Sequence, residues 1–109
     1  MNLKESDLRK LLATSHEHVV VDFAASWCGP CRMFASTFEA VSKKGMGKTV
    51  FAKVDIDECT QLCEDLNITA VPTVILFRAS KVVARHEGGF DTKVAFAGWL
   101  KTQRTANKK

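Results

Sequence analysis

The hydrophobic residues of the chain form short continuous runs that alternate with segments in which they recur every three or four positions. A continuous apolar run of about four to eight residues is typical of a strand that is buried on both faces. The clearest run, residues 18–24, reads His-Val-Val-Val-Asp-Phe-Ala. The predicted strands are residues 18–24, 50–55, 73–77 and 82–87, and residues 1–3 leave room for a short additional strand.

Apolar residues spaced three and four apart predict helices between these strands. The predicted helices are residues 6–14, 32–44, 58–66 and 92–103. The residues expected on their buried faces are Leu8, Leu11 and Leu12 in the first helix, Phe34, Phe38 and Val41 in the second, and Val94, Phe96, Trp99 and Leu100 in the last.

Local signals mark where some of these elements end. Asp91 is expected to cap the last helix through its side-chain oxygen. Asn67 is expected to end the third helix in the left-handed conformation. The strands at 73–77 and 82–87 predict a hairpin, although Ala79 and Ser80 replace the Asn-Gly that a tight hairpin turn prefers.

The order of elements, with strands and helices alternating before a final hairpin and helix, predicts an α/β fold. We expect a three-layer sandwich in which helices flank a central mixed β-sheet. The sequence contains no linker, repeat or low-complexity segment, so residues 1–109 are expected to form a single domain.

Composition narrows the class of protein. Apolar residues make up 46% of the chain and charged residues 26%, which is ordinary for a globular domain. No apolar run approaches the length of about 18 residues that a membrane span needs. The first seven residues carry acidic side chains where a signal peptide is basic, so we expect a cytoplasmic protein and no membrane partner.

The net charge of +4 comes largely from the C-terminal residues Lys101, Arg104, Lys108 and Lys109. Without them the chain is nearly neutral, and we therefore expect no nucleic-acid partner. Contact of this basic tail with nucleic acid or an anionic surface is the minor alternative.

Two cysteines lie two residues apart in the segment Trp27-Cys28-Gly29-Pro30-Cys31, between a predicted strand and a predicted helix. A Cys-x-x-Cys motif that follows a strand and begins a helix is typical of a redox pair. Only the thiolate attacks a disulfide, and the unpaired N–H groups of a helix N-terminus favour negative charge. Cys28 is therefore the expected nucleophile, and Cys31, one turn further in, is the expected resolving cysteine.

Together with this pentapeptide, three further segments make the chain resemble the thioredoxin family. They are Val-Val-Val-Asp-Phe ahead of the cysteines, Ala-Lys-Val-Asp at 52–55 and Ile-Thr-Ala-Val-Pro-Thr at 68–73. They occur in the family's order and at its spacing, and the resemblance covers nearly the whole chain. It implies the thioredoxin-like fold. Ala24 departs from the pattern, since many members have an aromatic residue there.

The resemblance also implies roles for residues around the cysteines. Gly29 and Pro30 form a neutral turn that favours a reductant, whereas oxidising relatives have a histidine between the cysteines. Asp22 lies within an apolar run, so burial should raise its pKa. The resemblance makes Asp22 the proton acceptor for Cys31 and Lys53 its cationic partner. The alternative is that Asp22 caps a turn or faces solvent.

A third consequence of the resemblance concerns the binding of substrates. It implies a cis peptide bond before Pro72, packed against the cysteine pair, with the backbone of Val71 free to pair with an extended substrate segment. Such a groove recognises backbone and would accept many proteins. The residues expected to line it are Trp27, Gly29, Pro30, Ala70, Val71, Pro72, Gly88 and Gly89.

Cys59 and Cys63 are spaced four apart on a predicted helix, so their side chains should share one face. With Cys28 and Cys31 they form a set of four, but the long gap between the pairs argues against a zinc site, and we expect no metal. Animal thioredoxins resemble this chain in having an additional cysteine where Cys59 stands, some of them regulatory. A regulatory role and simple filling of half-buried positions both stay open.

One further segment partly matches a nucleotide-binding motif. Gly47-Lys48-Thr49 matches the end of a phosphate-binding loop, but the earlier glycine that the motif requires is replaced by Ser42. The segment also leads from a helix to a strand, the reverse of the motif's context, so we do not expect a nucleotide-binding loop here.

These features predict a monomeric protein-disulfide reductase that takes part in cell redox homeostasis and needs no bound cofactor. The resemblance implies that electrons come from an NADPH-dependent thioredoxin reductase. It also implies that they pass to proteins such as ribonucleotide reductase, peroxiredoxins or methionine sulfoxide reductases. Two alternatives are an oxidase or isomerase of the same fold, and a non-enzymatic redox-sensitive binding module.

Overall fold

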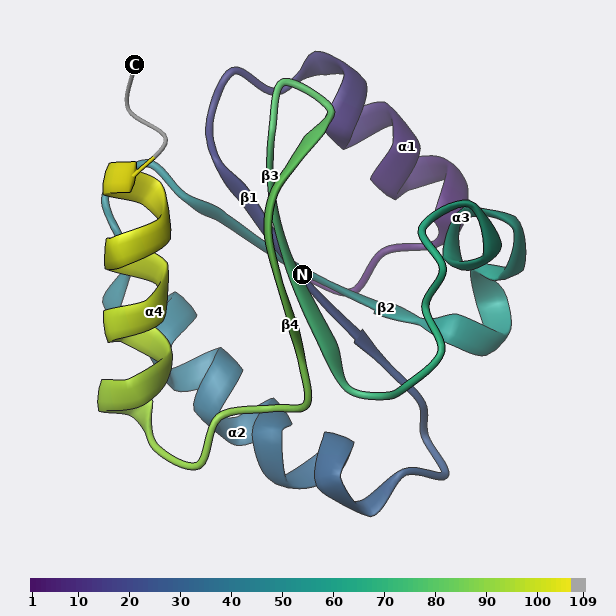
Figure 1. The fold of residues 1–109 in the computed structure, drawn as a ribbon. Coiled ribbons are helices and arrows are strands. Elements are labelled where there is room, and N and C mark those ends of the chain that lie inside the picture. Colours follow the sequence, from purple (N-terminus) through teal and green to yellow (C-terminus); the bar gives the residue numbers. More distant parts are fainter. Residues whose placement is uncertain (107–109) are drawn as a thin grey trace.

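The computed structural model, which describes residues 1–106, contains four strands in one mixed sheet of order β2-β1-β3-β4 (Figure 1). The strands are β1 (Val19–Ala24), β2 (Val50–Asp55), β3 (Thr73–Arg78) and β4 (Lys81–Glu87). β1 pairs with β2 in parallel, and β3 runs antiparallel to both β1 and β4. The predicted mixed sheet is confirmed.

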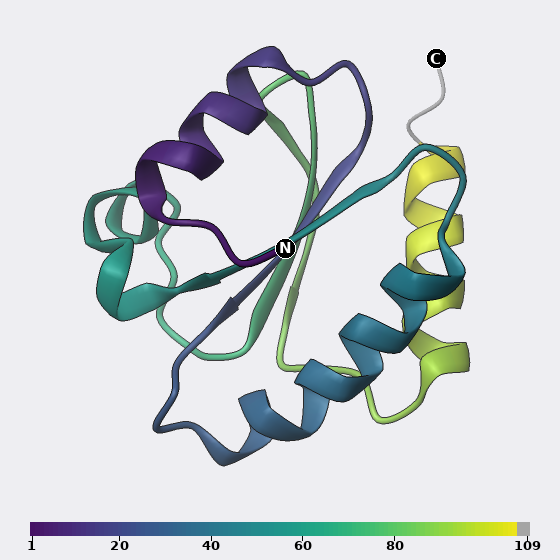
Figure 2. The same cartoon turned by 180° about the vertical axis from the view of Figure 1, so that it is seen from behind.

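Helices cover both faces of this sheet (Figures 1 and 2). They are α1 (Glu5–Thr14), α2 (Gly29–Lys44), α3 (Thr60–Asp65) and α4 (Lys93–Ala106), with a 3-10 turn, η1 (Ile56–Glu58), ahead of α3. α1 and α3 pack on one face of the sheet, and α2 and α4 pack on the other. The three-layer sandwich predicted from the sequence is therefore confirmed.

The central strand β1 explains why the apolar run at its position is unbroken. Val19, Val21 and Phe23 pack with α1 and α3, whereas Val20 packs with the phenylalanines of α2 and α4. Successive side chains of a strand point to opposite faces, so a strand covered on both faces must be apolar throughout. Asp22, on the same face as Val20, is the exception.

The N-terminal segment lies along the outer edge of β2. The N–H of Leu3 donates to the carbonyl of Lys53 at 2.8 Å, and the N–H of Lys53 donates to the carbonyl of Met1 at 2.8 Å. Only Asn2 forms a bridge with Lys53, and it is parallel. The short additional strand allowed for at residues 1–3 is thus a single bridge.

The helix predicted at residues 58–66 is wrong in its extent. Cys59 has a φ of −142°, which separates the turn η1 from the shorter helix α3. Asn67 does follow the helix in the left-handed conformation, with a φ of 55°, as predicted.

The start of α4 requires two corrections. Thr92, not Asp91, caps the helix, because its Oγ1 accepts a hydrogen bond of 3.0 Å from the N–H of Ala95. Val94 is 83% exposed, whereas Phe96 is buried as predicted. Residues two apart on a helix point in nearly opposite directions, so Val94 cannot share the buried face of Phe96.

The hairpin between β3 and β4 closes through a tight turn without the preferred residues. Ala79 and Ser80 both have positive φ, 51° and 67°, as the two central residues of a type I′ turn do. The hydroxyl of Ser80 donates to the carbonyl of Leu12 at 2.7 Å, which ties the turn to the end of α1.

The two ends of the sheet carry different features (Figure 1). The Cys28 end holds the β1–α2 loop, the residues before β3 and those after β4. The hairpin end, opposite, holds residues 15–18, 45–49 and 78–81 and the last turns of α4. Across residues 1–106, every helix is too short or too polar to span a membrane. Lys108 and Lys109 of the basic tail lie outside the described residues.

Candidate active site

Cys28 and Cys31 are joined by a disulfide at the start of α2. Cys28 is the N-cap residue of the helix and Cys31 lies in its first turn, with their Cα atoms 5.2 Å apart. Their exposed fractions are 6% and 2%. The sulfur nearer the end of the helix is therefore the one that a protein substrate can reach first.

The sulfur of Cys28 lies among groups that favour a negative charge on it. The backbone N–H of Cys31 donates to Cys28 Sγ at 3.1 Å. This N–H is one of the helix donors without a partner in the preceding turn, and the helix dipole adds to its effect. The carbonyl oxygen of Val71, 3.7 Å from Cys28 Sγ on the open side, has the opposite effect, but it lies farther away than this N–H. After reduction, this arrangement stabilises a thiolate at Cys28 more than at Cys31.

Gly29 and Pro30 occupy the first two positions of α2. Proline suits the first turn because its missing N–H removes no hydrogen bond within the helix. A Cβ added to Gly29 would meet no atom within 4 Å, so packing does not demand glycine there. The influence of this turn on the redox potential stays a prediction.

Asp22 is fully buried on the face of β1 that packs under α2, and neither of its carboxyl oxygens has a hydrogen-bond partner in the described chain. Its register partner on β2 is Lys53. Burial raises the pKa of Asp22 to about 7, against the smaller opposing attraction of Lys53. The carboxyl is therefore close to half ionised at neutral pH, as an acceptor of protons must be.

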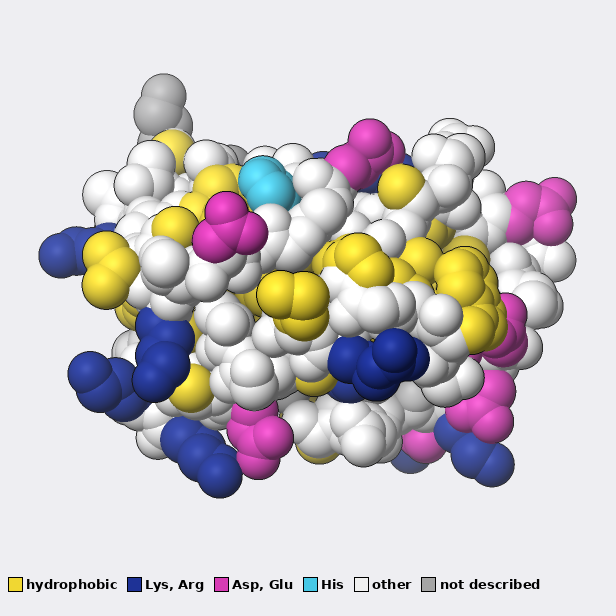
Figure 3. All heavy atoms as spheres, turned by 90° about the horizontal axis from the view of Figure 1, so that it is seen from below, with side chains coloured by type: hydrophobic (Ala, Val, Ile, Leu, Met, Phe, Trp, Pro, Cys, Tyr) yellow, Lys and Arg dark blue, Asp and Glu magenta, His cyan; other side chains and the backbone are white. Residues whose placement is uncertain are grey.

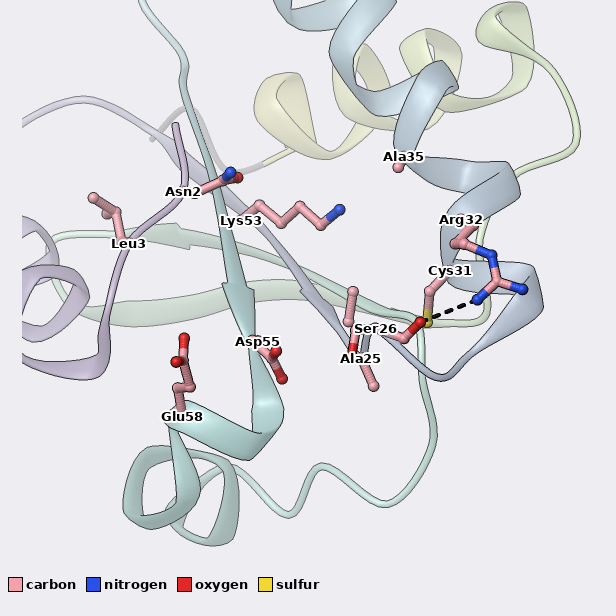
Figure 4. Close-up of a pocket in the computed structure, with 11 residues that line it drawn as sticks. Asn2, Leu3, Ala25, Ser26, Cys31, Arg32, Ala35, Lys53, Asp55 and Glu58 are labelled. Carbon is pink, nitrogen blue, oxygen red and sulfur yellow. Dashed lines mark hydrogen bonds between the residues drawn. The ribbon is translucent and has the colours of Figure 1, made fainter.

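A pocket of about 410 Å³ lies beside this region (Figure 4). Cys31, Ala24 and Lys53 are among the residues that line it, and Lys53 extends across it toward α2. A water molecule occupies about 30 Å³ in the liquid, so the pocket has room for several. Asp22 is the register partner of Lys53 and shares the face of Ala24, so its carboxyl lies beneath the wall of this pocket.

The loop before β3 lies against the cysteines. The Val71–Pro72 peptide bond is cis, as expected from the family resemblance. Thr73 Oγ1 donates to the carbonyl of Ala70 at 2.6 Å, and the N–H of Gly88 donates to the carbonyl of Pro72 at 2.7 Å. These bonds hold Val71 beside Cys28.

Two of the residues predicted to line the substrate groove share one pocket. Pro30 and Gly89 line a shallow pocket of about 290 Å³ with Met33, Phe34 and Phe90, which the sequence did not indicate. Trp27 lies outside that pocket. Figure 3 shows this end of the molecule, where hydrophobic side chains gather between scattered charged ones.

Trp27 is held by a residue that sequence reasoning missed. Its indole Nε1 donates to Asp57 Oδ2 at 3.0 Å, while 65% of the residue stays exposed. The N–H of Asp57 in turn donates to the carboxylate of Asp55 at 2.9 Å. Because β1 and β2 are parallel, their carboxyl ends meet at one edge of the sheet, and this is the signal that could have placed Asp57 near Trp27.

Gly89 is required by the close approach of α2. A Cβ at this position would lie 2.8 Å from the Cβ of Phe34 and 2.9 Å from its Cγ. Phe34 is buried among aromatic side chains, and its Cβ is fixed to the helix backbone, so it cannot move aside. Gly89 thus allows the β4–α4 loop to pack directly against Phe34 of α2.

We expect Gly89→Ala to lower the free energy of unfolding by about 1–3 kcal/mol, because it overpacks a fixed contact. The matched control is Gly98→Ala in α4, where an added Cβ meets nothing within 4 Å. The control should raise stability by about 0.5–1 kcal/mol, since alanine favours helices over glycine. Urea unfolding of the oxidised proteins measures both, and equal effects would contradict the proposed contact.

Cys59 and Cys63 are free thiols, both buried in the cluster under α1 and α3. Cys28 and Cys31 belong to a different cluster, so the structure separates the four cysteines into two pairs. Burial, followed by the neighbouring Cys63, raises the pKa of Cys59 to about 12, and burial also raises the pKa of Cys63. Covered thiols that stay protonated react slowly, so the fold lends no support to the regulatory role, which stays a prediction.

Comparison with known proteins gives a consistent picture. A model of the thioredoxin family matches residues 1–102. Thioredoxin H4 of Arabidopsis thaliana is 40% identical over 74 residues, which are 68% of this chain and 62% of that protein. A mitochondrial thioredoxin of Bos taurus is 43% identical over 82 residues, 75% of this chain and 49% of that protein. The chain thus spans about half to three-fifths of the length of these curated relatives.

Solved structures agree with the sequence comparison. The chain superimposes on a thioredoxin of Plasmodium falciparum with a TM-score of 0.83 and 31% identity, covering 93% of this chain and 96% of that one. A chloroplastic thioredoxin z gives the same TM-score of 0.83 with 25% identity, covering 95% and 93% of the two chains. These similarities extend over all the layers described above.

Proposed function

Because the chain belongs to the thioredoxin family, we propose that it reduces disulfide bonds in proteins through Cys28 and Cys31. The observation that supports this most strongly is the position of the pair. The two sulfurs are bonded to each other at the start of α2, and the N–H of Cys31 points at Cys28 Sγ. That geometry favours the reduced, thiolate form of the residue that a substrate meets first.

The reaction proceeds in two exchanges. The Cys28 thiolate attacks one sulfur of a substrate disulfide, so a mixed disulfide forms and the other substrate sulfur leaves as a thiolate that takes up a proton. Cys31 then loses its proton and attacks Cys28 Sγ. The mixed disulfide breaks, the second substrate thiol is released, and the Cys28–Cys31 disulfide of the structure results. Two electrons pass to the substrate.

Asp22 accepts the proton of Cys31 in the second exchange. With a pKa of about 7, Asp22 can be ionised when it must take the proton of Cys31. It can equally be protonated when the dithiol is restored. The pocket lined by Cys31 and Lys53 supports this proposal, because water in it could carry the proton once it reaches the carboxyl. The positive charge of Lys53 lowers the free-energy cost of ionising the buried carboxyl, so Asp22 can lose its proton near neutral pH.

Substrates bind as extended segments at the Cys28 end of the sheet. Val71, next to Cys28 Sγ, offers its backbone, and the exposed Trp27 and the pocket at Pro30 and Gly89 offer apolar surface. Such a surface selects for an accessible disulfide more than for a particular sequence. The substrates are therefore proteins, among them the peroxiredoxins, ribonucleotide reductase and methionine sulfoxide reductases that the resemblance implies.

We further propose that the protein works in a reducing compartment, the cytoplasm, where an NADPH-dependent thioredoxin reductase returns Cys28 and Cys31 to the dithiol. The two unpaired thiols, Cys59 and Cys63, are compatible with such a compartment, since structural cysteines of reducing compartments remain reduced. The protein acts as a monomer and carries electrons without a bound cofactor.

Reduction of insulin tests the proposal without knowledge of the natural partners. With dithiothreitol as the electron source, catalytic amounts of the protein should accelerate the reduction of insulin disulfides, followed as turbidity from the released chain. A rate no higher than that of dithiothreitol alone would count against a disulfide reductase.

A further inference from the structure

A second cleft lies at the hairpin end of the molecule, away from the cysteine pair. Its volume is about 500 Å³. Four segments that are distant in the sequence line it: the α1–β1 loop, the α2–β2 loop, the last residue of β3 and the end of α4. Figure 1 shows these segments together at the end of the sheet opposite the start of α2. His18 directly precedes β1, whereas Cys28 follows its other end, so the whole strand separates the two sites.

The cleft is strongly cationic. Lys48, Arg78, Lys101 and Arg104 line it, and Glu17 is the one acidic residue among the lining residues. Within residues 1–106, none of the four cations forms an ion pair or donates a side-chain hydrogen bond to another described residue. Cations that line one cleft repel one another, and a bound anion would relieve this repulsion.

Two buried nitrogen atoms at this cleft have no partner among the described residues. They are Nε of Arg104 and Nε2 of His18. The guanidinium of Arg104 lies against Gly47, where an added Cβ would be 2.7 Å from its Nη2. Burial, followed by the charges of Arg78 and Arg104, lowers the pKa of His18. A buried donor without an acceptor costs free energy, so the wall of the cleft lacks an acceptor at Arg104 Nε.

We propose that this cleft binds a small anion with several phosphate groups, held by Arg78, Arg104, Lys48 and Lys101. Guanidinium groups bind phosphate oxygens through paired hydrogen bonds, and lysines add charge at the rim. Four cations against one carboxylate match a ligand of multiple negative charge, and a volume of about 500 Å³ exceeds what a single phosphate fills. The four cations gather around one cleft, which favours a small molecule over a nucleic acid, because a nucleic acid would need a longer basic track.

The arrangement differs from the phosphate-binding loop that the sequence excluded. Lys48 and Gly47 come from a helix-to-strand connection, so no helix N-terminus faces the cleft there. The phosphates would be held by side chains and not by a cradle of backbone N–H groups. This gives Gly47 and Lys48 a role that the redox chemistry does not use, and the role does not depend on the proposed reductase activity.

The test is a titration of the oxidised protein with sodium tripolyphosphate. Calorimetry measures the binding, and NMR monitors the His18 ring. We expect saturable binding with one ligand per chain, a shift of the His18 signals and a rise in its pKa, because a nearby anion favours the imidazolium. That imidazolium would be flanked by Arg78, Arg104, Lys48, Lys101, His16 and Glu17. Inorganic phosphate should bind at the same site at least about tenfold more weakly.

Arg78→Gln/Arg104→Gln should weaken tripolyphosphate binding by about tenfold or more, since each removes a charged hydrogen-bond donor. The matched control, Lys10→Gln/Lys93→Gln, removes two exposed cations outside the cleft and should change affinity by less than about twofold. Circular dichroism shows whether the arginine variant still folds. If it does not, Lys48→Gln/Lys101→Gln repeats the test at exposed positions.

Several results would overturn the proposal. One is equal affinity of the arginine variant and the control variant, which would show diffuse attraction only. Another is binding to an oligonucleotide or to vesicles of anionic lipid without saturable binding of tripolyphosphate, which would assign the surface to a macromolecule. Insulin reduction by the same variants should be unchanged, so loss of phosphate binding and loss of redox activity are separate outcomes.

Discussion

Cys28→Ser is expected to lower the reduction of insulin disulfides to the rate of dithiothreitol alone. A serine hydroxyl is hardly ionised at neutral pH, so the N–H of Cys31 has no thiolate to stabilise and the first exchange cannot begin. The fold should persist, since serine is nearly isosteric with the cysteine thiol at the cap of α2. Turbidity of reduced insulin, together with circular dichroism of the variant, measures both expectations.

The matched variant is Cys31→Ser, which keeps the nucleophile and removes the resolving thiol. It should form the mixed disulfide with insulin and accumulate it, because no second thiol releases the substrate. Non-reducing electrophoresis or mass spectrometry detects the adduct at Cys28. Equal activity of Cys28→Ser and the unmodified protein, or an adduct at Cys59 or Cys63 instead, would contradict the assigned roles.

Asp22→Asn is expected to remove the loss of stability that this buried carboxyl causes as the pH rises. Burial raises the pKa of Asp22 from 3.8 to about 7, so the folded state holds its proton where the unfolded chain has lost it. A group of this kind destabilises the fold progressively between about pH 4 and pH 7 and fully above pH 7. By this shift, the cost above pH 7 amounts to about 4 kcal/mol.

The free energy of unfolding of the variant minus that of the unmodified protein should therefore grow by about 3–4 kcal/mol between pH 4 and pH 8. Urea unfolding of the oxidised proteins at both pH values measures this difference, and the subtraction removes the other titrating groups. Asp91→Asn, at an exposed carboxylate, is the control and should show little change with pH. A difference that stays constant with pH would mean that Asp22 titrates normally in the folded protein.

The fold could be predicted from the sequence because its signals are local and strong. The apolar run at β1 has a single interpretation as a buried strand, and a carboxylate inside such a run, Asp22, is enough to imply a raised pKa. The cis bond before Pro72, by contrast, followed only from resemblance to a family. Element ends were less certain: at α4, Asp91 and Thr92 are both good caps, and only the path of the backbone selects Thr92.

Other features depend on contacts between distant segments. The bond from Trp27 to Asp57 requires that β1 and β2 be aligned in parallel, and the room at Gly89 is defined by Phe34 of another helix. The basic cleft needs four segments to meet at the hairpin end, and its arginines look like ordinary surface charges in the sequence. Sequence patterns report the environment of one element at a time, so sites assembled from several elements are missed.

The most direct test of the proposed activity is the equilibrium of Cys28 and Cys31 against glutathione. The protein is incubated without oxygen in mixtures of glutathione and glutathione disulfide, quenched with acid, alkylated and analysed by mass. A reductant should remain in the disulfide form when the two forms of glutathione are present in comparable millimolar amounts, and it should open only with a stronger reductant such as dithiothreitol. A pair that is already dithiol in that mixture would be an oxidant, and the proposed direction of electron flow would be wrong.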